Sequence, residues 1–160
     1  MAQDDTLVVF TPLSAELPGS NSASVDVRNN HPIIDFDASV DEYVNFSNVI
    51  PNHYDNGDIK AIIHYSMSSA TTGNVIWNVT FERIDEEGQS LDSDGFAAYR
   101  SVTDTVPSTN GHIGVCEITF TQTQADSVEK GEGFRISVYR DTDDTAAGDA
   151  ELNFIELREV

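Results

Sequence analysis

Basic residues and cysteine are scarce in this 160-residue sequence, and both shortages narrow what the protein can do. Eight Lys and Arg stand against 28 Asp and Glu, which gives a formal net charge of −20. A field of that sign repels phosphate groups and anionic lipid headgroups, so we expect no nucleic-acid partner and no membrane partner. Cys116 is the only cysteine, which excludes an internal disulfide and a cysteine-rich zinc site.

Long apolar runs are also missing. No stretch approaches the roughly 20 residues that a membrane-spanning helix requires. The first residues, Met1 to Asp5, lack the basic and apolar regions of a signal peptide. A chain of this length buries roughly 70% of its extended-chain surface, which is enough for one core. We expect a flexible arm over residues 1–6 and a single domain over 7–160.

Motifs for catalysis are absent as well. The sequence contains no Gly-x-Ser-x-Gly motif, no glycine-rich phosphate loop and no His-Glu-x-x-His motif. The four histidines are far apart in the sequence: His31, His53, His64 and His112. No adjacent basic residue lowers the pKa of Cys116. We therefore expect that the protein is not an enzyme, with no catalytic, cofactor-binding or metal-ligating residues and no cofactor.

Clusters of acidic residues leave one alternative open. Asp35 and Asp37, with Asp41 and Glu42 nearby, have the spacing of a cation site or of an acid/base pair. The segments 92–95 and 141–144 resemble pieces of calcium loops, but neither continues to the closing Glu of an EF-hand. Asp, Asn and Gly are also the usual turn residues. We prefer solvated turns, and keep a Ca²⁺ site as the alternative.

Alternation with a period of two predicts β-strands, most clearly in residues 58–84. Five residues of the first run point to one side: Ile59, Ala61, Ile63, Tyr65 and Met67. Four apolar residues of the second run do the same: Val75, Trp77, Val79 and Phe81. A polar turn at 69–74 joins the two runs. We interpret the stretch as a β-hairpin whose apolar face needs a second layer.

Further strands are predicted throughout the chain, at 7–11, 24–28, 33–36, 43–50, 96–103, 112–123, 134–140 and 150–158. A single helical turn is expected at 124–131, capped by Asp126 or Ser127 and closed by Gly131. Turn signals recur about every eight to twelve residues, which is typical of all-β domains. The predicted fold is a single-domain antiparallel β-sandwich, jelly-roll-like.

Aromatic side chains offer the main test of function. Six of them are candidates for a platform on which sugar rings stack: Tyr43, Tyr54, Tyr65, Trp77, Tyr99 and Tyr139. Trp77 alternates with Val79 and Phe81, so we place it in the core. If the tyrosines are buried too, a sugar-binding role loses its main support, whereas exposed aromatic rows favour it.

Several stretches resemble a group of small acidic proteins of tailed bacteriophages. They are residues 28–38, 74–83, 134–135 and 148–152. The resemblance implies a structural virion protein, first of all a capsid decoration (cement) protein. Such a protein is made in the host cytoplasm, binds the major capsid protein on the outer capsid surface and forms a homo-oligomer, often a trimer. No catalytic or binding residue carries over from the group.

The alternative function is a carbohydrate-binding β-sandwich module of a tail fibre or spike that attaches to host glycans. The charge of −20 suits a decoration protein, because it keeps the protein away from packaged DNA and keeps particles apart. The arm Met1 to Thr6 and the loop Leu13 to Asn21 are the predicted contacts with neighbouring subunits. We rank decoration first and carbohydrate binding second.

Overall fold

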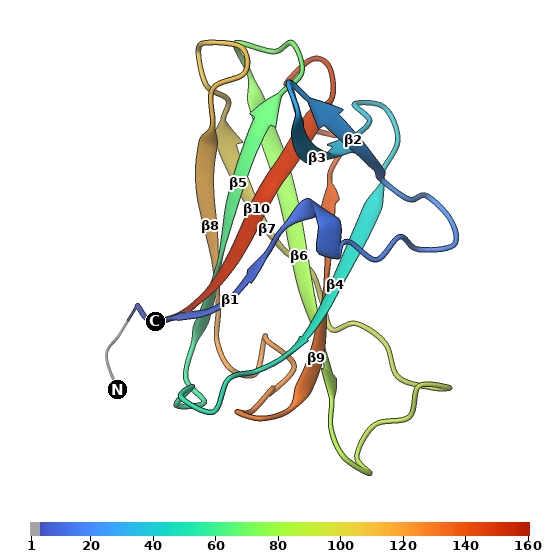
Figure 1. Ribbon diagram of the computed structural model, residues 1–160, viewed down its shortest axis with the longest axis vertical. Coiled ribbons are helices and arrows are strands. Elements are labelled where there is room, and N and C mark those ends of the chain that lie inside the picture. Colours follow the sequence, from blue (N-terminus) through green and yellow to red (C-terminus); the bar gives the residue numbers. More distant parts are fainter. Residues whose placement is uncertain (1–3) are drawn as a thin grey trace.

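The computed structural model describes residues 4–160, which form an antiparallel β-sandwich (Figure 1). Sheet A contains, in spatial order, β2 (Ser24–Arg28), β3 (His31–Phe36), β10 (Ala150–Glu159), β5 (Ile59–Met67) and β8 (Gly114–Phe120). Strand β1 (Thr6–Phe10) pairs with the second half of β10. Sheet B contains β4 (Tyr43–Val49), β9 (Gly133–Arg140), β6 (Asn74–Ile84) and β7 (Arg100–Thr105). The predicted all-β, jelly-roll-like sandwich is confirmed.

The core lies between the two sheets and is rich in aromatic rings. Trp77 of sheet B meets Phe36 of sheet A edge-on, with the ring centroids 5.1 Å apart. Phe81 meets Phe120 in the same way at 4.9 Å. The five apolar residues predicted to share one side of residues 59–67 are all buried in this core. Large aromatic side chains remove the most apolar surface from water, so these contacts account for much of the stability of the sandwich.

The predicted hairpin over 58–84 is wrong. Strand β5 belongs to sheet A, where β10 and β8 flank it, whereas β6 belongs to sheet B between β9 and β7. The turn at 69–74 therefore carries the chain from one sheet to the other. Both strands have an apolar side, and these sides face each other across the core instead of sharing one sheet. Alternation identified each strand but contained no information on its partners.

Two local predictions also need correction. Residues 124–131 form turns without a helix, because Asp126 and Ser127 have positive φ angles of 58° and 56°, outside the right-handed helical region. Strand β7 starts at Arg100, after the predicted start at 96. The only helix among residues 4–160 is the 3-10 turn η1 (Pro12–Ser14), and none in that range is long and apolar enough to cross a membrane.

The predicted arm over residues 1–6 falls partly on residues 1–3, which lie outside the described residues. Asp4 donates its backbone N–H to the carbonyl of Glu159 and forms an ion pair with Lys60 at 2.7 Å. Thr6 is the first residue of β1. In the loop Leu13 to Asn21, Glu16 pairs with Asn45 of β4 through two backbone hydrogen bonds.

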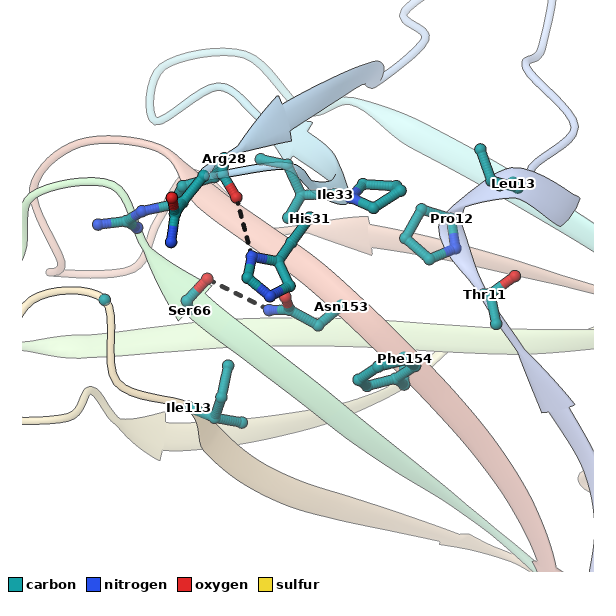
Figure 2. A pocket seen from close by; sticks show the side chains of 13 residues that line it. Thr11, Pro12, Leu13, Arg28, His31, Ile33, Ser66, Ile113, Asn153 and Phe154 are labelled. Carbon is teal, nitrogen blue, oxygen red and sulfur yellow. Dashed lines mark hydrogen bonds between the residues drawn. The ribbon is translucent and has the colours of Figure 1, made fainter.

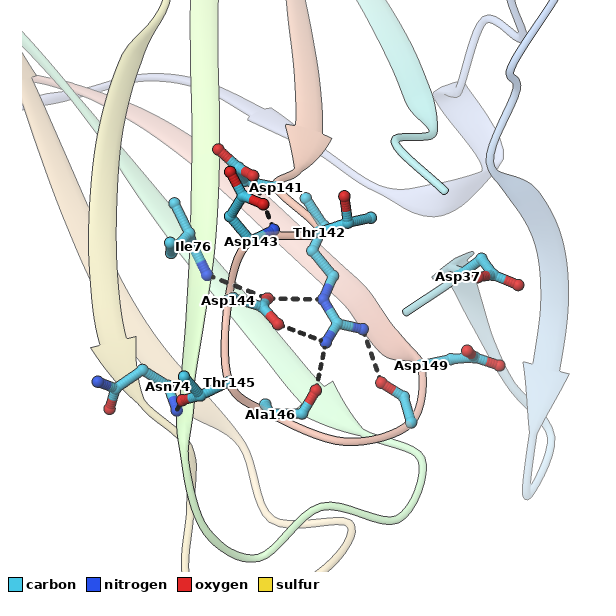
Figure 3. Close-up of polar contacts among 12 residues, drawn as sticks. Asp37, Asn74, Ile76, Asp141, Thr142, Asp143, Asp144, Thr145, Ala146 and Asp149 are labelled. Atoms are coloured by element: carbon cyan, nitrogen blue, oxygen red, sulfur yellow. Dashed lines mark hydrogen bonds and ion pairs between the residues drawn. The ribbon is translucent and has the colours of Figure 1, made fainter. Parts of the chain in front are cut away.

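The β9–β10 loop closes one end of the sandwich around the fully buried side chain of Arg140 (Figure 3). The guanidinium forms a bidentate pair with Asp144, with Nε–Oδ2 and Nη2–Oδ1 distances of 2.7 and 2.9 Å. It also donates to the carbonyls of Gly148 and Ala146 at 2.6 and 2.7 Å. The acidic segment 141–144 thus supplies the counter-ion of a buried arginine.

Replacing Asp144 with Asn should lower the free energy of unfolding by about 3 kcal/mol, because it leaves a buried guanidinium without its counter-ion. Urea denaturation monitored by Trp77 fluorescence measures the change. The control is Asp4→Asn, which weakens the pair of an exposed carboxylate with Lys60 and should alter stability little. Equal effects of the two substitutions would contradict a special role for the buried pair.

Candidate functional site

The outer face of sheet B is polar and aromatic, although much of it is shielded from water. The inward side chains of β4, β6 and β9 fill the core, so their alternate neighbours point outward. Strand register aligns these neighbours in three rows: Tyr43, Tyr139, Asn78 and Ser101; then Asn45, Ser137 and Thr80; then Ser47, Arg135 and Glu82. We call these rows, together with Tyr99, the tyrosine face.

Three tyrosines from different segments gather at one end of this face. The ring centroids of Tyr43 and Tyr139 lie 4.9 Å apart, and Tyr99 meets Tyr139 edge-on at 4.9 Å. The Tyr99 hydroxyl donates to Ser137 Oγ at 2.9 Å, which holds the ring over the sheet, and 37% of Tyr99 stays exposed. Partial burial raises the pKa of Tyr99 and Tyr139, so both hydroxyls are neutral at physiological pH.

Hydrogen bonds fix the polar side chains between the tyrosines and the far end of the face. Thr80 donates to the carbonyl of Ala97 at 2.7 Å, which ties the β6–β7 connection to the sheet. Ser101 donates to Asn78 Oδ1. With its amide oriented to satisfy both neighbours, Asn45 donates to Ser137 Oγ and accepts from Arg135 Nη2. These groups are held in place before any ligand arrives.

An ion pair lies at the other end of the face, in a hollow of about 700 Å³. The Arg135 guanidinium contacts Glu82 at 3.0 Å, and only 5% of the Glu82 side chain is exposed. Glu16 lies 3.7 Å from the same guanidinium and accepts a hydrogen bond from Ser47 at 2.8 Å. The Phe96 ring covers Arg135, with the guanidinium carbon 5.1 Å from the ring centroid. Leu91 and Asp94 complete the rim.

The arrangement combines flat rings with fixed polar groups. Tyrosine rings present apolar faces for stacking, and their hydroxyls both donate and accept hydrogen bonds. Ser47, Ser101, Glu16 and Arg135 reach the surface and supply further donors and acceptors, whereas the other polar side chains of the face are buried. A ligand that has apolar ring faces and many hydroxyl groups matches both features.

The six aromatic candidates divide equally between the core and this face. Tyr54, Tyr65 and Trp77 are fully buried, which confirms the core position predicted for Trp77. Tyr54 donates to the carbonyl of Gly57, and Tyr65 donates to Asp104 at 2.7 Å. The remaining three, which come from positions 43, 99 and 139, form the cluster.

Sequence reasoning missed the ion pair and its neighbours. A signal did exist for Arg135, because it alternates with the apolar residues Phe134 and Ile136 in a clear strand pattern. Glu82 likewise follows the apolar residue Phe81 in the alternating pattern of β6. No local signal links Glu16 or Phe96 to either residue, since long loops bring both to the sheet.

Known proteins resemble this chain in structure but not in sequence. No protein-family model matches the sequence, and no curated protein sequence does either. The CBM22-1 xylan-binding domain of Paenibacillus barcinonensis Xyn10C is similar with a TM-score of 0.55 and 14% identity, over 100% of this chain and 97% of that domain. A family 35 carbohydrate-binding module from an environmental isolate is similar with a TM-score of 0.56 and 13% identity, over 94% of this chain and 92% of that module.

The C-terminal CBM6 of the laminarinase LamC from Zobellia galactanivorans gives a TM-score of 0.53 and 11% identity, over 97% of this chain and 100% of that module. Several other similar structures are much larger, and the chain spans only 11 to 21% of their length. At these identities the similarity establishes the fold alone.

The acidic residues of these clusters accept hydrogen bonds from backbone and hydroxyl groups, in local turns or, for Asp41, from a distant loop. Asp37 accepts hydrogen bonds from the backbone and hydroxyl of Ser39, Asp41 accepts two from Thr142, and Asp94 accepts one from the Ser90 backbone. Within residues 4–160, no group of three or more His, Cys, Asp or Glu side chains is arranged to hold a metal ion. Cys116 is buried, and burial raises the pKa of its thiol to about 12.

Asp35 is the acidic residue with the most perturbed environment. It points outward from sheet A, directly opposite Glu151 on β10. Its Oδ1 is buried without a hydrogen-bond partner among the described residues. Burial, followed by the nearby charges of Asp149 and Glu151, raises the pKa of Asp35 to about 6.

Asp35 should therefore make stability depend on pH. A raised folded-state pKa favours the folded protein fully below about pH 4, and this contribution is lost as the pH rises through 6. Asp35→Asn should stabilise the protein at pH 7.5 by about 1 to 2 kcal/mol, a figure already reduced for solvent screening. Below pH 4 the two proteins should match. Denaturation across this pH range tests the prediction, and a constant difference would contradict it.

Proposed function

We propose that the protein is a carbohydrate-binding β-sandwich module that holds a glycan on the tyrosine face. The carrying observation is the alignment of Tyr43, Tyr99 and Tyr139 with the Glu82–Arg135 pair along one outer face of sheet B. The similarity in fold to carbohydrate-binding modules supports this proposal. Carbohydrate binding, the second-ranked hypothesis from the sequence, is therefore now the preferred function.

The chemistry of a sugar ring suits this face. One side of a pyranose presents C–H groups that pack against an aromatic ring, and its hydroxyls both donate and accept hydrogen bonds. Tyr139 and Tyr99 would supply the stacking surface. The guanidinium of Arg135 and the exposed carboxylate of Glu16 beside it would pair with neighbouring hydroxyls, one as donor and the other as acceptor.

Charge favours an uncharged glycan. The hollow at the far end of the face contains Glu16, Glu82 and Asp94, and its one cation, Arg135, is already paired. The net charge of −20 adds a repulsive field for uronic acid or sulfate groups. We expect neutral polysaccharides to bind more tightly than anionic ones.

On this face the glycan is bound and is not cleaved. Glycoside hydrolysis requires one carboxyl group that donates a proton to the leaving oxygen. The Glu82 carboxylate at this face is held in an ion pair with Arg135 and is almost fully covered. That the protein is not an enzyme stays a prediction from the sequence.

Capsid decoration, with the major capsid protein as partner and a trimer as assembly, stays a prediction from the resemblance. None of the contacts within residues 4–160 bears on that partner. A glycan-binding module within a tail fibre or spike is compatible with both the resemblance and the tyrosine face.

Binding to neutral and anionic polysaccharides, measured by affinity electrophoresis and calorimetry, tests the proposal. Tyr139→Ala should weaken binding to a neutral polysaccharide by roughly 10- to 100-fold, because it removes a central aromatic contact. The matched control is Phe154→Ala, which removes an exposed aromatic ring on the opposite sheet and should leave binding unchanged.

Two results would overturn the proposal. One is that no polysaccharide retains the protein. The other is that Tyr139→Ala, shown to be folded by its thermal transition, binds as tightly as the wild type. Ordered density on capsids that lack the protein, seen by cryo-electron microscopy after mixing, would then restore the decoration hypothesis.

A further inference from the structure

A second hollow lies on the outer face of sheet A (Figure 2). Because the tyrosine face belongs to sheet B, the core separates the two. Its volume is about 670 Å³. The 3-10 turn η1 and β3 form one wall with Pro12, Leu13 and Ile33, and the segment before β8 forms the other with Ile113. Phe154 of β10 lies between them. Parts of the chain far apart in sequence therefore build one concave surface.

The rim of this hollow exposes more apolar surface than a solvated sheet needs. Leu13, Ile113 and Phe154 are 78%, 52% and 48% exposed. Isolated exposed apolar residues are ordinary, but three that converge on one concavity are typical of a binding site. The Phe154 ring also contacts His64 edge-on at 5.9 Å, which fixes its orientation.

A break in strand pairing orients the polar group of the hollow. The register between β10 and β5 shifts between Leu152 and Phe154, so Asn153 has no partner residue on β5. Such bulges redirect side chains and are common beside functional sites. Here the break places Asn153 in the lining of the hollow beside Phe154.

Two of the polar residues that line the hollow, His31 and Asn153, offer hydrogen-bond acceptors. His31 Nδ1 lies 3.2 Å from the carbonyl oxygen of Arg28, which can only accept, so in the neutral ring the proton sits on Nδ1 and Nε2 accepts. Asn153 Nδ2 donates to Ser66 Oγ and to the Glu151 carbonyl at 3.2 and 3.1 Å. Its Oδ1 accepts from no residue in the range 4–160, and Figure 2 shows the two side chains converging.

The charge beside the hollow selects against anionic ligands. Arg28 lines it and pairs with Glu151 at 2.7 Å, so its charge is already balanced and is not free to hold an anion. An anionic ligand would also meet acceptors within a protein of charge −20. The match is a ligand without negative charge that has an apolar body and a hydrogen-bond donor.

We propose that this hollow binds a small aryl alcohol of the phenol type. The aromatic ring lies against Phe154, Leu13 and Ile113, and the hydroxyl donates to His31 Nε2 or Asn153 Oδ1. The site is independent of the tyrosine face, so a failure of glycan binding would not contradict this proposal, and the reverse also holds.

Titration of the isotope-labelled full chain with p-cresol, followed by NMR, tests the site. Shifts should concentrate on the methyl groups of Leu13, Ile33 and Ile113. The matched ligand is 4-methylanisole, which has the same ring but a methylated oxygen and so no donor. We expect p-cresol to bind roughly fivefold more tightly, the value of one hydrogen bond. Equal affinities, shifts elsewhere or no shift at millimolar ligand would each overturn the proposal.

Substitutions give a second test with its own control. His31→Phe and Asn153→Leu should each reduce the preference for p-cresol over 4-methylanisole, whereas Phe154→Ala should weaken both ligands. Tyr139→Ala, on the tyrosine face, should change neither. The comparison of the two ligands on the wild-type protein needs no variant, so it decides the proposal even if a substitution disturbs folding. An unchanged preference in both acceptor variants, with dispersed spectra, would overturn the assigned roles.

Discussion

Burial of one side of the central strands between two sheets is the constraint on which the other features depend. Successive side chains of a strand point to opposite faces, so inward packing of Trp77 and Phe81 places Asn78 and Glu82 outward. A slip of one residue would exchange the two sets and destroy core and site together. The tyrosine face is therefore a direct consequence of how the core packs.

The two outer faces use the same scaffold for different chemistry. Sheet B presents tyrosines and fixed polar groups along regular strands, which suits a long hydroxyl-rich ligand. Sheet A carries a compact apolar hollow at a break in the pairing of β10, which suits a small ligand. Sandwich folds host many functions because their outward positions vary without cost to the core.

The few basic residues are used for structure. Five arginines have carboxylate partners: Arg28, Arg83, Arg135, Arg140 and Arg158. Each is held in place by its partner, and several of the other acidic side chains accept hydrogen bonds within turns. Arg140 is the extreme case, because its burial requires Asp144 and two carbonyl groups to surround it. The negative surface and the local arginine pairs together disfavour anionic ligands.

The sequence by itself determined most of the strands, the apolar side of those with clear alternation, the core position of Trp77 and the all-β class, because alternation is a local property of the chain. Only the tertiary structure decided that β5 and β6 lie in different sheets. It also decided that Tyr43, Tyr99 and Tyr139 meet while Tyr54 and Tyr65 are buried, and that Glu16 and Phe96 reach Arg135. These outcomes depend on pairing between distant segments and on loop paths, and residues far apart in the sequence carry no local record of their partners.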